Sequence, residues 1–529
     1  MADVQKLRAA AKELVDKASN SESPACLSDD VESALTDSVT LTSVYNTIRL
    51  SDTRINTVHE DLAVVDVYLR KPTRIRCESS DEAAASKLYQ WVRDSIIPSR
   101  PFAKHSQFDT NAPPSLRDGE VARAHAKALI ALRVLGHLHE LVPLAEPRLL
   151  VTVVAGLATF TDTRDAWTTP EACKEATALL EACLDISRSK QKDTKGLMTA
   201  LLREEIRPLF AKSKNNALTQ QGRKAINPLP EKVEASEQEA DIKPWKYSHV
   251  HIVTVFKWVL ERVDASTVED NWPLIIPPLL TLIDDETTAY KSKGCELLTV
   301  LLKATHPDFI QRTGLGEVFQ DAVMPCLSYL PTLTPETESL HLLGAAYPAL
   351  IALAHVRYPK DGEDLKQKTR FLGRILRQGV LKGYVHASEH GKIAELLIVQ
   401  IAVLVDEMGI SCVKHLKDLL PIISSILSAP FATSYPPLLR ASVRSMQQII
   451  LNGWPRIGYH RGQVLQGLVI CWCRIREDRA GSEDLEAIQD AIKATVGLLR
   501  VATRDEETIT EDFRTMVASD ARLRELLLP

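Results

Sequence analysis

The stretch Trp272–Leu302, WPLIIPPLLTLIDDETTAYKSKGCELLTVLL, decides the fold of this 529-residue chain. It contains two apolar stripes at helical spacing, separated by the acidic pair Asp284-Asp285. We expect the first helix to open at Trp272-Pro273, because proline is tolerated in a first helical turn, and to end at the acidic pair. The second helix carries Gly294 and four leucines on one face. Neither helix can bury its stripe alone, so the pair needs similar hairpins on both sides. This pattern predicts an all-α fold, an α-solenoid of HEAT/armadillo-like helical hairpin repeats.

A second hairpin of the same kind lies between Leu416 and Ile450. One apolar stripe precedes Pro430, and another follows Pro436-Pro437. Apolar helix centres also recur at intervals of 47, 48 and 48 residues, at Leu280, Leu327, Ile375 and Ile423. This spacing lies at the upper end of the roughly 40–47 residues that such repeats occupy.

Composition agrees with helix packing and divides the chain into three regions. Hydrophobic residues make up 45% of the chain and aromatic residues only 5%, as is usual where leucine and alanine pack between helices. A polar stretch with few large apolar residues interrupts the helical patterns. We therefore predict an N-terminal helical region over residues 1–210, a polar linker or mobile loop over 211–244, and a C-terminal HEAT-like α-solenoid over 245–529.

Charge and cysteine usage bear on compartment and partners. The net charge of −5 lacks the basic excess that drives binding to nucleic acid. The start of the chain does not resemble a secretory signal, and the longest apolar segment, 393–405, is too short for a span of about 20 residues. Nine scattered cysteines are typical of a reducing compartment. We expect a cytoplasmic and nuclear protein that binds neither nucleic acid nor membrane.

One catalytic pattern is present in part. His386, Glu389 and His390 match the H-x-x-E-H sequence of some zinc peptidases. On one helix the two imidazoles would share a face and the glutamate could activate a metal-bound water. The chemistry needs a third ligand, which the sequence does not identify. A zinc hydrolase is therefore an alternative, and the main expectation is a non-enzymatic chain with no catalytic residue, cofactor or metal.

Two further groups of residues are candidates for structure or binding. Asp284 and Asp285, with the lysines of the following helix, fit a charge ladder between adjacent hairpins, and we favour this structural role over ligand binding. Trp454, Pro455 and Arg456 follow Asn-Gly, a helix-stop signal. Tryptophan and arginine beside a turn can anchor a protein interface, or they can close the core under the next repeat. Both interpretations stay open.

At these residues the chain resembles a known family. The residues that carry the resemblance are a repeat signature and three short segments: Trp272, Pro273, Pro278, Asp284, Asp285 and Gly294, with 312–319, 325–335 and 454–457. Together, in this order, they resemble the second Tel-two-interacting protein (Tti-two), in the form of a fungal member. The resemblance covers about residues 245–473, whereas the N-terminal third is similar only in length and helical character.

This resemblance implies a scaffold subunit of the TTT co-chaperone complex. Its partners would be the first Tti protein and Tel-two. The complex supports the folding, assembly and stability of phosphatidylinositol-3-kinase-related kinases, together with the ninety-kilodalton heat-shock chaperone and its adaptors. No catalytic residue or cofactor carries over. A generic HEAT-repeat adaptor, such as a transport receptor or a phosphatase scaffold, would show the same periodicity and is the alternative.

Overall fold

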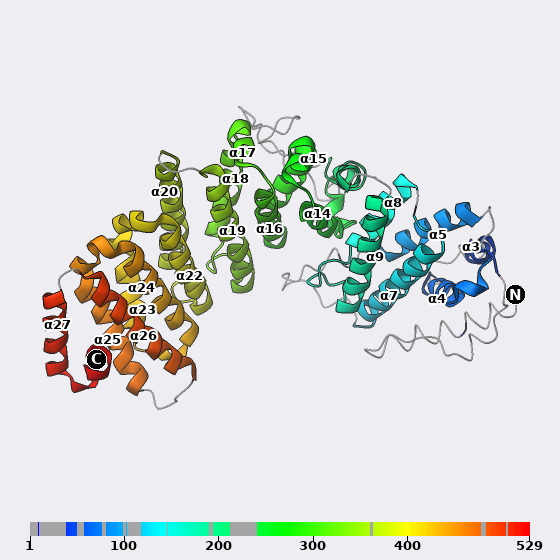
Figure 1. Cartoon of the computed structure of the whole chain (residues 1–529). Helices are drawn as coiled ribbons and strands as arrows, with labels where there is room; N and C mark the ends of the chain where they lie inside the picture. Colours follow the sequence, from blue (N-terminus) through cyan, green and yellow to red (C-terminus); the bar gives the residue numbers. More distant parts are fainter. Residues whose placement is uncertain are drawn as a thin grey trace. The chain divides into compact units, whose positions relative to one another are not determined.

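The computed structural model describes most of the chain, and its described residues form two compact units, residues 1–281 and 282–529. The described residues are 9, 39–49, 58–76, 81–98, 102, 118–144, 146–189, 194–211, 241–359, 363–477, 483–503 and 506–528. Apart from one isolated β-bridge between Val39 and Ile75, all their regular structure is helical (Figure 1). The all-α prediction is confirmed.

Unit 1 stacks its helices in two rows. The rows are α4 (Val58–Leu69), α7 (Asp118–Leu141) and α9 (Pro170–Ser189), and beside them α3 (Leu41–Arg49), α5 (Asp81–Ile96) and α8 (Pro147–Ala158). A run of α10, η3 and α11 (Thr194–Ala200, Leu201–Ile206 and Arg207–Phe210) follows. Then come α13 (Pro244–Tyr247), α14 (Ile252–Leu260) and α15 (Ala265–Asp284), inside which the boundary between the units falls. The predicted linker 211–244 lies mostly outside the described residues, which omit 212–240.

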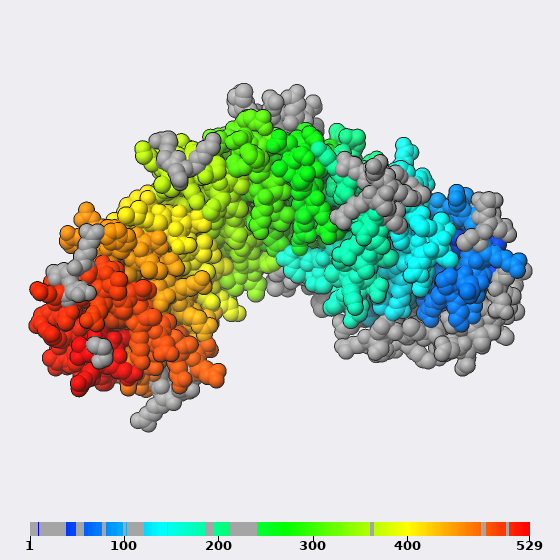
Figure 2. Space-filling view, in the orientation of Figure 1, coloured from blue at the N-terminus to red at the C-terminus, as the bar shows by residue number. Residues whose placement is uncertain are grey.

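Unit 2 repeats helical hairpins along its length. One row consists of α16 (Thr288–Lys303), α19 (Glu336–Arg357), α22 (Gly391–Met408), α24 (Pro436–Ile457) and α26 (Glu483–Ala502), each packed on the next. The other row begins with α17 (Pro307–Thr313) and α18 (Leu315–Val323), which η4 (Met324–Ser328) extends. It continues with α20 (Glu363–Ile375), which η5 (Leu376–Leu381) and α21 (Lys382–Ala387) extend. The last two helices of this row are α23 (Leu416–Leu427) and α25 (Arg461–Glu477). Short turns η6 (Gly409–His415), η7 (Ala432–Ser434) and η8 (Gly458–His460) connect them, and α27 (Glu506–Ser519), η9 (Ala521–Leu523) and α28 (Arg524–Leu527) end the unit. Successive segments follow one another as neighbouring bands in Figure 2.

Buried apolar stripes hold each row together, as the periodicity predicts. The four expected centres, Leu280, Leu327, Ile375 and Ile423, are all buried, each on the first helix of its hairpin or on that helix's extension. Serines add hydrogen bonds between neighbouring helices: Ser445 Oγ donates to the Ile398 carbonyl at 2.7 Å, across α24 and α22. Small residues at these contacts let the helix axes approach closely, so the hairpins interlock in one register.

Two helix boundaries differ from the predictions. Helix α15 begins at Ala265 and not at Trp272, with Pro273, Pro277 and Pro278 inside it. Asn452-Gly453 does not stop α24, which continues to Ile457. Gly453 is buried because Leu416 lies against it, where a methyl group would stand 3.3 Å from Leu416 Cδ2. In both places tertiary packing overrides the local helix-start and helix-stop signals.

Unit 2 contains two long apolar helical stretches. Two helical stretches of the described chain, Glu336–Arg357 and Gly391–Leu427, match a membrane span in length and apolar composition. Both lie within the stacked rows of unit 2, where their apolar residues pack against neighbouring helices.

The seven cysteines in the described ranges are all reduced thiols: Cys173, Cys183, Cys295, Cys326, Cys412, Cys471 and Cys473.

Candidate partner-binding surface

The acidic turn after α15 is built for structure. Asp285 is buried, and its carboxylate accepts a hydrogen bond from the Thr287 backbone N–H at 2.9 Å. Lys291 reaches back from α16 and donates to the Ile283 carbonyl at 3.0 Å, where a cation complements the negative end of the helix. Lys291 thus acts within its own hairpin, whereas we expected a ladder between adjacent hairpins.

Gly294 belongs to the same turn and has a steric role. A methyl group at this position would stand 2.7 Å from Ile283 Cγ1 and 2.8 Å from the Ile283 backbone nitrogen. Only a residue without a side chain lets α16 approach α15 this closely. In the repeat signature, Gly294 is therefore explained by packing, and Trp272 is buried as well.

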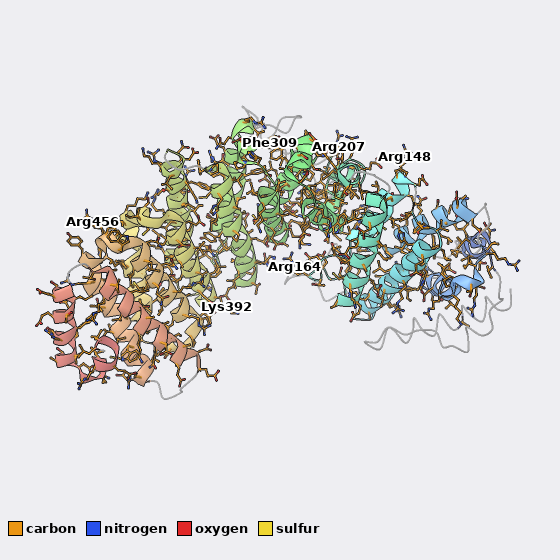
Figure 3. The ribbon with its side chains drawn as sticks, viewed as in Figure 1. Arg148, Arg164, Arg207, Phe309, Lys392 and Arg456 are labelled. Atoms are coloured by element: carbon orange, nitrogen blue, oxygen red, sulfur yellow. The ribbon has the colours of Figure 1, made fainter. Side chains whose placement is uncertain are left out.

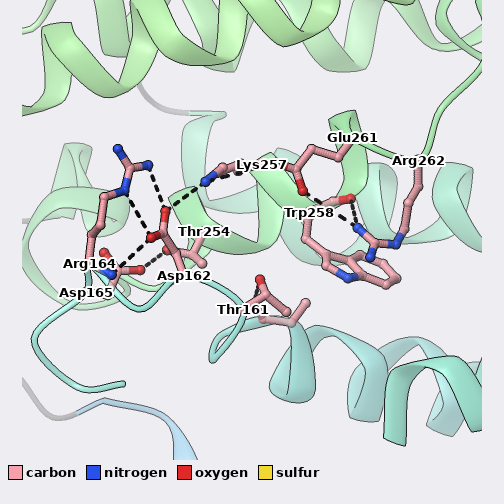
Figure 4. A network of polar contacts seen from close by, with 10 residues as sticks. Thr161, Asp162, Arg164, Asp165, Thr254, Lys257, Trp258, Glu261 and Arg262 are labelled. Atoms are coloured by element: carbon pink, nitrogen blue, oxygen red, sulfur yellow. Dashed lines mark hydrogen bonds and ion pairs between the residues drawn. The ribbon is translucent and has the colours of Figure 1, made fainter. Parts of the chain in front are cut away.

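A polar network in unit 1 ties the loop between α8 and α9 to α14 (Figure 4). The carboxylate of Asp162 accepts hydrogen bonds from Arg164 Nη2 at 2.8 Å and from Lys257 Nζ at 2.9 Å. Burial alone would raise the pKa of Asp162, but these hydrogen bonds outweigh burial and hold the pKa below its ordinary value. Thr254 Oγ1 donates to Asp165 in the same loop.

The cations of this network lie beside a carboxylate or an aromatic ring. Arg262 lies over the ring of the buried Trp258, with its guanidinium carbon 4.3 Å from the ring centroid. The arrangement anchors a loop, and the Thr254 hydroxyl and the Asp165 carboxylate that it contacts are both buried. We assign it to the stability of unit 1.

The H-x-x-E-H residues do not lie on one helix. His386 is near the end of α21, Glu389 is in the turn that follows, and His390 immediately precedes α22. All three side chains are exposed. Within the described ranges, no three His, Cys, Asp or Glu side chains are arranged to hold a metal ion. The shared face that zinc chemistry requires is therefore not formed by these residues.

Exposed large apolar side chains are confined to unit 2 among the residues that the structure describes. They are Leu333, Leu365, Val385, Val399, Val403, Ile410, Phe431, Leu451, Trp454, Tyr459 and Val501. Isolated apolar residues on a surface are normal, but a group on neighbouring helices marks an interaction site. Such a group occurs on α22 and α24.

We define the α22–α24 surface by exposed residues of this helix pair and of the turn that follows: Val399 and Val403 on α22, Leu451, Trp454 and Arg456 on α24, and Tyr459 on η8. Val399 and Val403 lie one turn apart on α22 and are 39% and 37% exposed. The hydrogen bond from Ser445 to the Ile398 carbonyl sets the register of the two helices. In that register Val403 is level with Leu451, which is 50% exposed on α24. The two helices thus present apolar side chains at equivalent positions.

Trp454, Pro455 and Arg456 lie at the C-terminal end of α24, and the structure places them at the surface. Trp454 is 42% exposed, Pro455 is half-buried, and Arg456 is exposed with its guanidinium 5.7 Å from the ring centroid of Tyr459. Figure 3 shows Arg456 at one end of the helices of unit 2 and Lys392 at the other. Trp454 therefore does not close the core, and its role in binding a partner stays a prediction.

Val399, Val403, Leu451 and Tyr459 were not among the predicted site residues. The signal for three of them is present in the sequence, because Val399, Val403 and Leu451 fall on helix faces that should be polar. In a leucine-rich chain, however, these residues could equally belong to the edge of a broad buried stripe, and the sequence does not distinguish the two cases. Tyr459 follows a helix end, where the periodicity carries no information.

Solved structures similar to this chain include karyopherins. The crystal structure of the karyopherin Kap121p bound to the extreme C-terminus of the protein phosphatase Cdc14p has a TM-score of 0.40 and 12% identity, over 96% of this chain. Kap121p alone gives a TM-score of 0.39 and 12% identity over 99% of this chain. The match covers 47% of the Kap121p chain in both cases, so this chain spans about half its length.

The comparison with protein families is more specific. The Tti2 family matches residues 153–434, slightly more than half of the chain. The match begins upstream of the region on which the sequence resemblance rested and includes the network around Asp162 as well as the turn around Gly294. Trp454, Pro455 and Arg456 lie beyond its end. The chain belongs to the Tti2 family.

Proposed function

We propose that this protein is a non-enzymatic scaffold subunit of the TTT co-chaperone complex, which binds the first Tti protein and Tel-two. Family membership supports this role. The proposal extends to support for the folding, assembly and stability of phosphatidylinositol-3-kinase-related kinases, together with the ninety-kilodalton heat-shock chaperone, in cytoplasm and nucleus. Kinase clients and chaperone adaptors would be reached through the complex.

The observation that carries the proposal is the α22–α24 surface. Aromatic residues and arginine are enriched among the residues that dominate binding at protein interfaces, and this surface contains Trp454, Tyr459 and Arg456. Stable interfaces bury about 1,200–2,000 Å² in total, and stacked helices offer a continuous surface on that scale. We therefore place the main docking surface for the larger Tti partner in unit 2.

Affinity purification of the full-length chain followed by mass spectrometry tests the proposal. We expect the first Tti protein and Tel-two among the recovered proteins. Recovery of a Ran-like GTPase or a phosphatase subunit in their place would favour a generic HEAT-repeat adaptor. Stoichiometric zinc in the purified protein, measured by elemental analysis, would favour a hydrolase.

Variants of the same chain locate the docking surface. The triple variant Leu451→Ser, Trp454→Ala and Tyr459→Ala should lose the larger Tti partner. A matched control replaces three apolar residues that are at least as exposed but lie elsewhere in unit 2: Leu333→Ser, Val385→Ser and Phe431→Ser. Equal retention of the partner by both variants would move the interface away from α22 and α24.

A further inference from the structure

A group of exposed cations in unit 2 forms no ion pair with the described part of the chain. The basic ridge, as we name it, consists of Arg370, Arg374, Arg377, Lys414 and Lys417. The first two lie on α20, Arg377 on η5, and the lysines on η6 and the start of α23. All five side chains are exposed, and none forms an ion pair with any residue that the structure describes.

Other cations of the same unit behave differently. Arg461 contacts Asp512 at 2.7 Å, Lys493 contacts Glu525 at 2.8 Å, and Arg522 contacts Glu477 at 2.7 Å. Exposed arginines and lysines in this unit therefore find carboxylates where the packing brings them within reach. The basic ridge differs because its cations lie on neighbouring elements without such a carboxylate, whereas the exposed Lys392, Arg444 and Arg500 are spread over three helices, α22, α24 and α26.

Three of the ridge residues, Arg370, Arg377 and Lys414, are close enough for their charges to interact. Burial, followed by the charges of Arg377 and Arg370, lowers the pKa of Lys414. A methyl group on Gly373 would stand 3.4 Å from Arg377 Nη1 and 3.2 Å from Nε2 of the buried His415, so the guanidinium lies beside the residue that follows Lys414. Like charges on neighbouring helices repel, and a bound anion would relieve that repulsion.

The backbone under the ridge is irregular as well. Arg377 belongs to η5, a π-helical turn inserted between α20 and α21. Such turns inside α-helices are frequent at functional sites. Here the turn accompanies a close contact, since a methyl group on Gly379 would stand 2.7 Å from Leu327 Cδ1. The packing therefore holds Arg377 on a rigid, buried base.

Exposed apolar residues on the same elements indicate which kind of anion fits. Leu365 on α20 and Ile410 on η6 are 47% and 60% exposed, in the same elements as the cations. No exposed large aromatic side chain lies on α20, η5, η6 or α23, so the stacking platform of a single-stranded nucleic-acid site is not present there. Carboxylates interspersed with apolar residues match this surface.

We propose that the basic ridge binds a segment of a partner protein that is rich in aspartate and glutamate and contains an apolar anchor. The inference rests on the proposed function for the class of ligand, a protein. It adds a second contact region, on the row of helices that contains α20 and α23, whereas the α22–α24 surface lies mainly on the other row.

The test uses the full-length chain and a short fluorescein-labelled peptide of aspartate, glutamate and leucine, followed by fluorescence anisotropy at several salt concentrations. A peptide with asparagine and glutamine in place of the acids is the first control. The variant Arg370→Glu, Arg377→Glu and Lys414→Glu should bind the acidic peptide about tenfold more weakly, because exposed charge pairs contribute modestly and add.

A matched variant separates the ridge from net charge. Lys392→Glu, Arg444→Glu and Arg500→Glu changes the charge equally on exposed positions of α22, α24 and α26, and it should bind the peptide as the unaltered chain does. Asp418→Asn, which removes the exposed carboxylate next to Lys417, should bind the peptide more tightly. Circular dichroism and thermal unfolding verify that each variant is folded.

Several results would overturn the inference. Both triple variants could weaken binding of the acidic peptide equally, or the unaltered chain could bind the uncharged peptide. The chain could also bind single-stranded nucleic acid or a phosphorylated peptide but not the acidic peptide.

Recovery of the first Tti protein is measured with the same variants. If that protein is never recovered but the ridge still binds the acidic peptide, the proposed function fails and the ridge remains. If recovery is normal and the peptide does not bind, only the ridge fails.

Discussion

Unit 1 and unit 2 use the same kind of helix, but their surfaces and polar contacts differ. Among the described residues, every large apolar side chain that is exposed lies in unit 2. Unit 1 instead ties a loop to α14 through partly buried charges, with Lys257 donating to Asp162 at 2.9 Å. Unit 2 joins neighbouring helices through serine hydroxyls, as between Ser445 and Ile398, and through surface ion pairs near its end.

The difference indicates where stability and binding are located. A loop fastened by charges resists rearrangement, because separating a partly buried carboxylate from its donors leaves both uncompensated. Exposed apolar residues add little to the stability of the isolated chain and become useful when a partner covers them. Unit 1 has the features of a rigid support, and unit 2 those of a docking unit.

The largest effect is expected at the closest helix contact. Gly294→Val should lower the free energy of unfolding by about 3 kcal/mol, because the added methyl groups would meet the Ile283 backbone. Urea unfolding measures this change. Gly497→Ala is the control, since nothing lies within 4 Å of a methyl group there, and it should stabilise the chain by about 0.5–1 kcal/mol. A tolerated valine at position 294 would mean that α15 and α16 can separate.

The next effect tests unit 1 by pH. Burial, followed by the charges of His249 and Arg93, lowers the pKa of His251 to about 3 from an ordinary 6.5. Since the folded pKa is the lower one, protonation favours unfolding, and stability falls as pH drops from about 6.5 toward 3. At pH 5 the loss is about 2 kcal/mol. His251→Phe should reduce the pH dependence of urea unfolding by about this amount, whereas replacing the exposed His390 by glutamine should leave the pH dependence unchanged.

A smaller effect is expected for the loop network. Asp162→Asn should destabilise unit 1 by about 1 kcal/mol at neutral pH, a value reduced for solvent screening of Lys257 and Arg164. Because the folded pKa of Asp162 is depressed, the difference from the unaltered chain should shrink as pH falls below about 4. Hydrogen exchange in the loop before α9 reports the change. Glu175→Gln, at an exposed position of the same unit, serves as the comparison.

The smallest effect on stability is expected on the α22–α24 surface. Leu451→Ser should change the free energy of unfolding by less than about 0.5 kcal/mol, since the side chain is half exposed. The same variant should weaken recovery of the larger Tti partner. If the isolated chain loses several kcal/mol, Leu451 serves the core of unit 2, and the contrast between the two units disappears at this residue.

Much of the fold could be predicted from periodicity. The stripe on α23 and the positions Leu439, Val443, Met446 and Ile450 on α24 are buried as expected, because apolar residues at helical spacing must face a neighbour. The residues at which helices begin and end were harder to predict. Pro273 and Gly453 are helix-breaking residues by local preference, yet both lie inside helices whose packing outweighs that preference.

For the α22–α24 surface, too, the sequence predicted the candidate residues but not their exposure. Trp454 and Arg456 could be named as interface candidates from residue type alone, but both a buried and an exposed Trp454 fitted the pattern. Its exposure depends on where α24 ends and on how Gly453 meets Leu416, a contact between residues 37 positions apart. The basic ridge likewise depends on α20 and η6 being neighbours.

The spacing of apolar residues along the sequence thus determined the helical class, the hairpin repeat and the residues of each buried stripe. All three depend on intervals of three and four residues within a helix. Which apolar side chains stay uncovered, which cations lack a carboxylate, and which glycine must remain a glycine were decided by packing between distant segments. Those contacts join residues tens of positions apart, and no periodicity within one helix encodes them.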